Sequence, residues 1–181
     1  NVVIGAARRG INVCYLSPLS QDHFGQQFAR YLADNGACYG LPFFSSAPSS
    51  LAMVSVDAQQ QPQYSLYRNG IADRAVSAEQ QIAALPGNCK LLHLGSLTLE
   101  PQDAPRIRMV LQAAAAQHIL ISVDINVRLN AVSDITAYRA FLSEVTAQSQ
   151  FIREHMKSDD DWAIVIDQLN ESLHEDSVKK L

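Results

Sequence analysis

The spacing of hydrophobic positions predicts an alternation of helices and short strands along this chain. Residues 21–35 form a helix with one apolar stripe, at positions i, i+4, i+7 and i+8: Phe24, Phe28, Tyr31 and Leu32. Residues 1–9 also have helical spacing, and Gly10 and Gly36 are suitable ends for the two helices. Between the helices, residues 11–16 are short and β-prone, which predicts a strand.

The second half of the chain continues this alternation. Helices are predicted over 77–85, 103–117 and 136–146, and strands over 90–94 and 118–123. The second of these strands, HILISV, is almost continuously apolar, as is typical of a central parallel strand covered on both faces. Strands that alternate with helices indicate a doubly wound α/β sandwich.

One stretch interrupts the alternation with two strands and no helix. Leu51–Val56, with the sequence LAMVSV, is short, apolar and β-branched, and the run QYSLYR that follows alternates polar and apolar residues. Tyr64 and Leu66 share one face of the second strand. The polar run AQQQP between the strands predicts a hairpin with a loop longer than the tightest kind. An edge hairpin of an ordinary α/β domain is one interpretation, and an inserted lid is the other.

Composition and charge narrow the class of protein. The chain has 181 residues, of which 48% are hydrophobic and 18% charged, a balance typical of a globular domain. The net charge of -4 and the lack of a basic block argue against a nucleic-acid partner. Three widely spaced cysteines, without a C-x-x-C motif, argue against a zinc site and fit a reducing cytoplasm. The sequence contains neither a membrane-length apolar run nor a signal peptide pattern.

The residues after the hairpin suggest a specific relationship. Tyr67 and Arg68 end the second strand, and Gly70, Ala72 and Asp73 form a Gly-x-Ala-Asp run. With its flanks, this stretch resembles the sugar-binding lid of the ribokinase/PfkB carbohydrate kinase family, within the branch of fructokinases and 2-keto-3-deoxygluconate kinases. The resemblance implies that Tyr67, Arg68 and Gly70 bind the sugar.

The beginning of the chain resembles the same family. Asn1 begins a helix that Gly10 ends, a strand follows, and D-x-F-G at 22–25 begins the next helix. The chain opens on Asn1, directly in a helical pattern, so we expect that it lacks its true N-terminus and, with it, the Gly-Gly pair that precedes this Asn in relatives. The keto-deoxy-gluconate kinases have an aromatic residue where this chain has Leu66, and this difference favours a neutral ketohexose as the substrate.

The segment DINVR follows the predicted central strand, at the end of the strand where ligands of open α/β sheets bind. Arg128 offers a planar fork of donors for a carboxylate or phosphate, and Asn126 can both donate to and accept from sugar hydroxyls. The segment resembles the family's Asp-x-Asn-x-Arg motif, which implies that both residues bind the substrate. The alternative is that Asp124 and Arg128 pair with each other or with neighbours and hold the loop.

Two further residues have competing interpretations. We interpret His93 as a packed core histidine rather than a catalytic base, because strand interiors usually lie out of reach of a reacting proton. In the segment KSDDDW, Asp161 resembles a family acid that influences magnesium and phosphate. The alternative for this segment is a solvated helix start, with Ser158 as the N-cap and acids near the positive end of the helix dipole.

Together, these resemblances imply a ribokinase-like three-layer α/β/α sandwich, with a mostly parallel sheet and a small inserted β lid, truncated at both ends. Residues 1–38 and 77–181 would form the partial kinase core, and residues 39–76 the lid. The implied activity is the transfer of the γ-phosphoryl group of MgATP to a primary hydroxyl of a ketohexose, as in a fructokinase. The family's catalytic Asp belongs to a Gly-Ala-Gly-Asp motif, which does not occur in these 181 residues. We therefore expect no catalytic residue in this chain and no activity from the chain alone.

Two other functions compete with the kinase. A kinase remnant would fold and dimerise through its lid without catalysing a reaction. A sugar-binding regulator would use the same lid, although no DNA-binding helix pair is evident in the sequence. The partners expected for the kinase are a small sugar, ATP and a second copy that pairs through the lid, because an unpaired apolar strand edge otherwise promotes aggregation.

Overall fold

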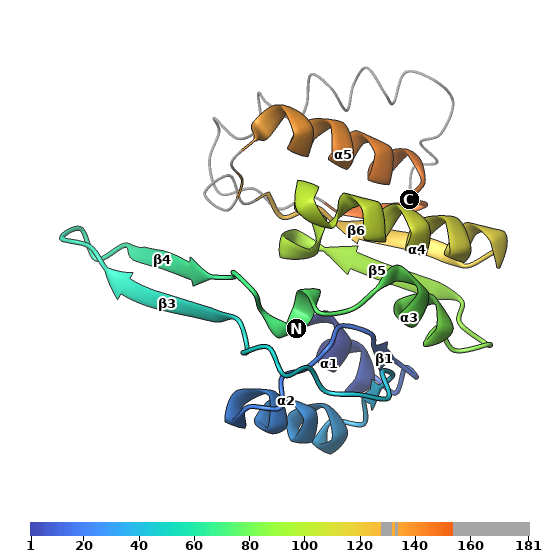
Figure 1. The fold of residues 1–181 in the computed structure, drawn as a ribbon, viewed down its shortest axis with the longest axis horizontal. Coiled ribbons are helices and arrows are strands. Elements are labelled where there is room, and N and C mark those ends of the chain that lie inside the picture. The colour runs from blue at the N-terminus through green and yellow to red at the C-terminus, as the bar shows by residue number, and fades with distance from the viewer. Residues whose placement is uncertain (128–131, 133, 154–181) are drawn as a thin grey trace. The chain divides into compact units, whose positions relative to one another are not determined.

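The computed structural model describes residues 1–127, 132 and 134–153, which form helices, strands and short turns (Figure 1). These residues divide into two compact units, one from Asn1 to Asn88 and one that begins at Cys89. The hairpin belongs to the first unit, and a three-stranded parallel sheet belongs to the second.

The first unit contains two pairs of strands and three α-helices. In chain order, its elements are α1 (Val2–Ala7), β1 (Cys14–Tyr15), α2 (His23–Asp34), β2 (Cys38–Tyr39), β3 (Leu51–Val56), β4 (Pro62–Tyr67), the 3-10 helix η1 (Ala72–Arg74) and α3 (Ala78–Ala83). β1 pairs in parallel with β2, and β3 pairs antiparallel with β4. The helices predicted over 1–9, 21–35 and 77–85 are confirmed with shorter ends, whereas the strand predicted over 11–16 is only two residues long.

Asp22 and Gly25 at the start of α2 each have a physical reason for their position. The Asp22 side chain accepts a hydrogen bond from the backbone N–H of Gly25 at 2.8 Å, which satisfies a free donor of the first helical turn. A Cβ atom on Gly25 would lie 2.0 Å from the backbone oxygen of Ser20, so only glycine fits there. The helix ends before Gly36, whose φ of +76° lies in the left-handed region that glycine adopts freely.

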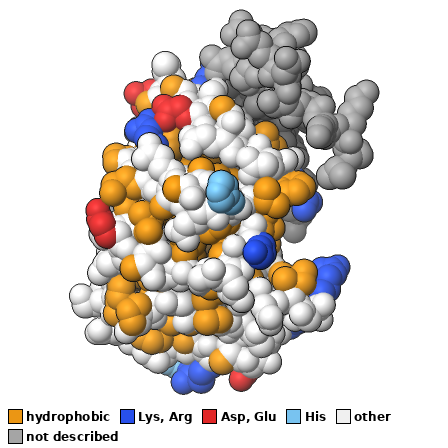
Figure 2. Space-filling model, turned by 90° about the vertical axis from the view of Figure 1, so that its right-hand side faces the viewer, with side chains coloured by type: hydrophobic (Ala, Val, Ile, Leu, Met, Phe, Trp, Pro, Cys, Tyr) orange, Lys and Arg blue, Asp and Glu red, His pale blue; other side chains and the backbone are white. Residues whose placement is uncertain are grey.

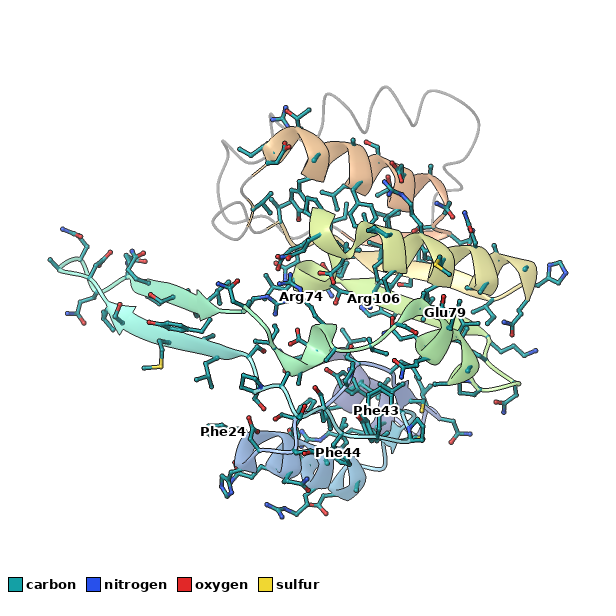
Figure 3. The ribbon with its side chains drawn as sticks, viewed as in Figure 1. Phe24, Phe43, Phe44, Arg74, Glu79 and Arg106 are labelled. Carbon is teal, nitrogen blue, oxygen red and sulfur yellow. The ribbon has the colours of Figure 1, made fainter. Side chains whose placement is uncertain are left out.

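The apolar stripe of α2 is present, but most of it faces solvent. Leu32 is fully buried in a small core with Ile4 and Leu19, and burial of such a side chain contributes about 1.5–3 kcal/mol. Phe24, at the start of α2 (Figure 3), and Tyr31 remain 57% and 45% exposed. The spacing thus identifies the helix correctly, while the tertiary structure buries only one edge of the stripe.

The predicted hairpin is confirmed as a two-stranded sheet of its own. Its strands pair from Leu51 opposite Tyr67 to Val56 opposite Pro62. Asp57 organises the loop at its tip, since its Oδ1 accepts from the backbone N–H groups of Gln59 and Gln61 at 2.9 and 2.8 Å. Except for Leu66, which is half-buried, every residue of both strands is exposed.

The second unit is a parallel sheet with helices between its strands. In chain order, its described elements are β5 (Leu91–Gly95), the 3-10 helices η2 (Ser96–Leu99) and η3 (Pro101–Asp103), α4 (Ala104–Ala116), β6 (Leu120–Asp124), α5 (Ile135–Ala147) and β7 (Phe151–Arg153). The strand order is β5-β6-β7, and β6 pairs in parallel with both neighbours. The central parallel strand predicted over 118–123 is therefore confirmed, as β6 at Leu120–Asp124, and so are the helices predicted over 103–117 and 136–146.

Strand β5 corrects one interpretation of the sequence. Along this strand Leu92 and Leu94 are buried, while His93 lies on the opposite, exposed face. Its ring Nδ1 lies 3.1 Å from the Oγ atom of Ser122 on β6. The interpretation of His93 as a packed core histidine is wrong, because residues alternate between the two faces of a strand and the leucines occupy the buried face.

The described surface mixes charged, hydrophobic and other polar side chains. On the face drawn in Figure 2, Lys and Arg side chains are spread among hydrophobic and uncharged ones. Across the described residues, no helix is both long enough and apolar enough to cross a bilayer.

Candidate functional site

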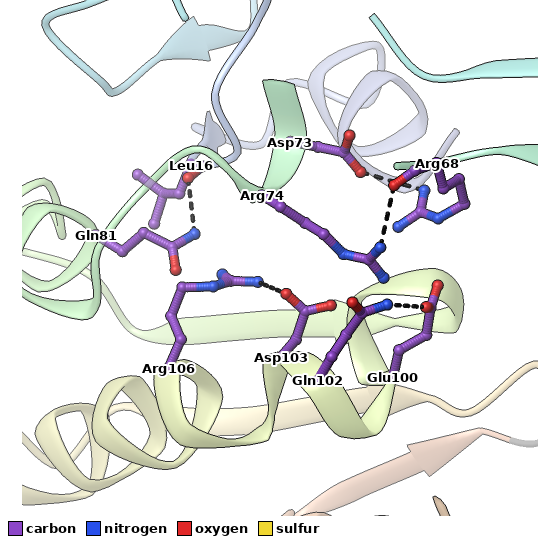
Figure 4. Close-up of polar contacts among 9 residues, drawn as sticks. All are labelled: Leu16, Arg68, Asp73, Arg74, Gln81, Glu100, Gln102, Asp103 and Arg106. Atoms are coloured by element: carbon purple, nitrogen blue, oxygen red, sulfur yellow. Dashed lines mark hydrogen bonds and ion pairs between the residues drawn. The ribbon is translucent and has the colours of Figure 1, made fainter. Parts of the chain in front are cut away.

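Arg68 lies at the root of the hairpin, directly after β4. Its Nη1 atom lies 3.2 Å from Asp73 Oδ2, and the two side chains are only 12% and 29% exposed (Figure 4). The backbone carbonyl of Arg68 also accepts a hydrogen bond from Arg74 Nη1 at 3.3 Å. Two successive residues of η1 thus hold the side chain and the backbone of Arg68, which gives its guanidinium a defined position.

The turn between β4 and η1 depends on Gly70. Its φ of +60° lies in the left-handed region, and this backbone conformation brings the chain back so that Asp73 meets Arg68. Ile71 and Ala72 are buried immediately after the turn, which anchors η1 in the first unit. Tyr67, by contrast, is exposed at the end of β4. Of the predicted site residues Tyr67, Arg68 and Gly70, which are neighbours in the sequence, the structure thus holds Arg68 in place and leaves Tyr67 exposed.

The other root of the hairpin is tied to α2. The Asp22 carboxylate, which caps α2, also accepts hydrogen bonds from the backbone N–H and the Oγ–H of Ser49, at 2.7 and 2.8 Å. Next to it, the backbone N–H of Ala72 donates to the Pro48 carbonyl at 2.8 Å. The hydrogen bonds that the Asp22 carboxylate accepts lower its pKa far below the usual value, with the Gly25 N–H the largest cause and the Ser49 N–H the next.

Asn126 lies just beyond the carboxyl end of β6, in the second unit. Its φ of +40° is a left-handed conformation that few residues other than glycine and asparagine adopt readily. The preceding residue, Ile125, is fully buried and its backbone N–H donates to the carbonyl of Arg153 at 2.9 Å. Among the described residues, no partner lies within hydrogen-bond distance of the buried Oδ1 atoms of Asn126 and Asp124. Buried polar atoms are usually paired, so these two oxygens are candidates for a ligand contact.

Two predicted site residues, Arg128 and Asp161, lie outside the described residues. Tyr67, Arg68 and Gly70 belong to the first unit, and Asn126 belongs to the second. Within the described residues, no group of three or more His, Cys, Asp or Glu side chains has an arrangement that could hold a metal ion.

Sequence reasoning missed a group of buried polar residues at the start of α4. Asp103 accepts from Arg106 Nη2 at 2.8 Å, and Glu100 accepts from Gln102 Nε2 at 2.9 Å (Figure 4). Both acids are buried. The signal in the sequence is the polar run EPQD directly before a helical pattern, but the pattern does not show that these acids are buried.

Comparison with known proteins identifies the family. The family description "pfkB family carbohydrate kinase" matches residues 1–152. The chain belongs to the pfkB family of carbohydrate kinases. This match confirms the resemblance to this family that the sequence predicts.

Individual members of the pfkB family are similar over most of this chain. It is 28% identical to a fructokinase of Solanum tuberosum over 167 residues, which are 91% of this chain and 52% of that protein. A fructokinase structure from Xylella fastidiosa superposes with a TM-score of 0.76 at 21% identity, over 93% of this chain and 53% of that one. A structure of fructokinase from the same organism with bound ATP has a TM-score of 0.75 at 20% identity, with the same coverage.

These likenesses confirm the ribokinase-like α/β fold of the pfkB family. The chain spans about half the length of the relatives that it matches. Its described residues contain the hairpin of β3 and β4 and the parallel strand β6, with Asn126 just beyond the carboxyl end of β6.

Proposed function

We propose that this chain forms part of an ATP-dependent, fructokinase-like sugar kinase and contributes sugar-binding residues. The observation that carries the proposal is Asn126 at the carboxyl end of a central parallel strand, with a buried Oδ1 that has no partner among the described residues. An amide at that place suits a sugar hydroxyl, since it can accept and donate at once. The names of the relatives support a ketohexose as the sugar and ATP as the phosphoryl donor.

The proposed roles follow from side-chain chemistry. Residues 39–76 act as the lid and the remaining residues as the kinase core. Arg68 and Arg128 hold sugar oxygens by charge-assisted hydrogen bonds, and Tyr67 and Gly70 shape the lid surface over the sugar. Asp161 would be the acid that influences magnesium and phosphate. ATP supplies the phosphoryl group, and the residues of this chain bind and orient the sugar hydroxyl that receives it.

The 181 residues do not contain the Gly-Ala-Gly-Asp motif whose Asp would accept the hydroxyl proton. We therefore expect the chain alone to bind sugar without phosphorylating it. A coupled ADP-release assay with fructose, in a preparation free of host kinases, measures this directly. Turnover above the protein-free control would contradict this expectation and would place the catalytic base among these 181 residues.

Sugar binding is tested with Arg128 and Asn126. Arg128→Ala and Asn126→Ala should weaken fructose binding, measured by calorimetry, and the loss for Arg128 should be about 1.5–3 kcal/mol. Arg128→Lys should not restore the affinity, because a point charge does not reproduce the planar fork. A large loss of thermal stability with unchanged fructose affinity would instead support a structural Asp124–Arg128 pair and end the assignment of Arg128.

An inactive protein that binds sugar or dimerises through its lid is the second candidate function. It is favoured by the exposed apolar side chains of the hairpin, which need no catalytic base to serve as a binding surface. The kinase is distinguished from it by restoring a downstream Gly-Ala-Gly-Asp segment from a relative. A kinase part should then gain fructose-dependent ADP release, whereas an inactive remnant should bind fructose without turnover.

A further inference from the structure

Asp22 makes two kinds of contact with one carboxylate. Its Oδ1 accepts from the Gly25 backbone N–H at 2.8 Å and from the Ser49 hydroxyl at 2.8 Å. Its Oδ2 accepts from the Ser49 backbone N–H at 2.7 Å. The first contact caps α2, while the other two fix a residue that lies 27 positions further along the chain and two positions before β3.

The Ser49 contacts belong to a wider set of bonds at the hairpin roots. On the β3 side, Pro48 accepts from the Ala72 backbone N–H at 2.8 Å, so the residue next to Ser49 is joined to η1. On the β4 side, η1 holds Arg68 through Asp73 and Arg74. Both ends of the hairpin are therefore attached to the same 3-10 turn, and Asp22 is the link from that arrangement to α2.

We propose that Asp22 is a positioning residue that fixes the root of the hairpin, in addition to capping α2. The hairpin has its own two-stranded sheet, and such a pair of strands is only marginally stable in water by itself. Its direction relative to α2 is then set at its roots, where Asp22 supplies charge-assisted hydrogen bonds to Ser49. The consequence for a sugar depends on the proposed function of the hairpin as a lid, but the positioning itself does not.

The chemistry of the carboxylate allows the two roles to be separated. Asparagine is as good an N-cap as aspartate, so Asp22→Asn keeps an Oδ1 for the Gly25 N–H. Its amide group, however, replaces Oδ2 with a donor that faces the Ser49 N–H, and two donors cannot bond to each other. The low pKa of Asp22 means that the wild-type carboxylate is ionised at neutral pH and accepts at both oxygens.

The decisive experiment measures backbone amide hydrogen exchange by NMR in the wild-type chain and in Asp22→Asn. The amides of β3 and of Ala72 should exchange about ten times faster or more in the variant, as expected for the loss of a hydrogen bond to a charged group. The amides in the interior of α2 should change less than about twofold, because its cap is retained. Ala72 is the informative site, since its bond to Pro48 does not involve Asp22.

Asp134→Asn is the matched control. Asp134 caps α5 by accepting from the Ala137 backbone N–H at 2.9 Å, and it is exposed. This substitution should leave the exchange rates of both helices and of the hairpin unchanged. Asp22→Ser is a second variant that keeps a capping hydroxyl on a side chain too short to reach Ser49, and it should reproduce the Asp22→Asn pattern if the asparagine variant folds poorly.

Two outcomes would overturn the proposal. Equal acceleration of amide exchange in α2 and in the hairpin would show that Asp22 acts only through the helix. Unchanged exchange at β3 and Ala72 would show that the Ser49 contacts do not stabilise the root of the hairpin. A parallel titration with fructose separates this result from the proposed function. If the wild type binds fructose, Asp22→Asn should weaken the affinity several-fold; if it does not bind fructose, the sugar-binding function fails while the exchange result still decides the positioning role.

Discussion

Arg68 and Asp73 form an ion pair at the root of the hairpin, with Nη1 and Oδ2 separated by 3.2 Å. The pair joins the residues on either side of the left-handed turn at Gly70. The backbone carbonyl of Arg68 also accepts a hydrogen bond from Arg74. A guanidinium carries five N–H donors, so an arginine held by a carboxylate can also bind a ligand. The pair thus orients the Arg68 guanidinium at the root of the hairpin.

Asp73→Asn should therefore weaken fructose binding and destabilise the first unit. The amide keeps the size of the side chain but removes the charge that holds the guanidinium, so we expect a loss in unfolding free energy of about 1–3 kcal/mol. Calorimetry and chemical denaturation measure the two effects, and Asp34→Asn, at the exposed end of α2, is the control. If Asp73→Ala and Arg68→Ala have strictly additive effects on stability, the pair is not an energetic unit.

Gly25→Ala should destabilise the chain strongly. Its Cβ atom would lie 2.0 Å from the backbone oxygen of Ser20, and backbone cannot move aside as cheaply as a flexible side chain. We expect a loss of about 3 kcal/mol, measured by chemical denaturation. Gly5→Ala is the matched control, because the nearest atom there is Arg9 Nη1 at 3.8 Å. That substitution should instead stabilise α1 by about 0.5–1 kcal/mol, and a similar gain at Gly25 would contradict the close approach.

His93 should make stability depend on pH. Although His93 lies on the exposed face of β5, desolvation by the protein around its ring lowers the pKa of the ring below the usual value, and the nearby Asp124 carboxylate acts in the opposite direction. The folded chain then binds fewer protons than the unfolded chain. The contribution of His93 to the free energy of unfolding is fully present above the unfolded pKa of about 6.5. It is lost as the pH falls through the lower folded pKa.

The measurement compares unfolding free energies between about pH 7.5 and 5 in the wild type and in His93→Gln. The variant should lose less stability as the pH falls. Ser122→Ala removes the hydroxyl 3.1 Å from the ring but leaves the imidazole, so it should keep the pH dependence of the wild type. Identical slopes for the wild type and His93→Gln would show that another group titrates.

The hairpin should mediate dimerisation through one face. Val54 pairs with Tyr64, and the neighbouring pairs on that face, Ala52 with Leu66 and Val56 with Pro62, are also apolar. Val54 and Tyr64 are 57% and 54% exposed, which leaves an apolar surface for a second copy to cover. Val54→Lys should shift the chain from dimer to monomer in size-exclusion chromatography with light scattering.

Ser55→Lys is the control for this prediction, because Ser55 pairs with Gln63 on the opposite, more polar face. It adds the same charge one position away and should leave the dimer intact. A wild-type chain that is monomeric at all concentrations, or a dimer that survives Val54→Lys, would rule out this face as the interface.

The sequence alone determined the α-helices, the hairpin and the strands β5 and β6 in their order, but not the short strands β2 and β7. The periodicity of α2 and the continuous apolar run of β6 depend on neighbouring residues, and both elements occur where the sequence predicts them. The helix predicted over 77–85 also occurs there, as α3, and Ser77 forms a capping box with Gln80 at its start. The hairpin, too, follows from local alternation and a polar turn. The family resemblance then supplied the ribokinase-like fold and the candidate residues.

Only the tertiary structure decided which faces are buried and which distant side chains meet. The stripe of α2 does not reveal that Leu32 is buried while Phe24 is exposed. The pattern of the strand predicted over 90–94 does not reveal that His93 faces outward. The contact of Asp22 with Ser49 joins residues 27 positions apart. Local propensity is set by neighbours in sequence, whereas burial and long-range hydrogen bonds depend on how the elements pack, and no short segment carries that information.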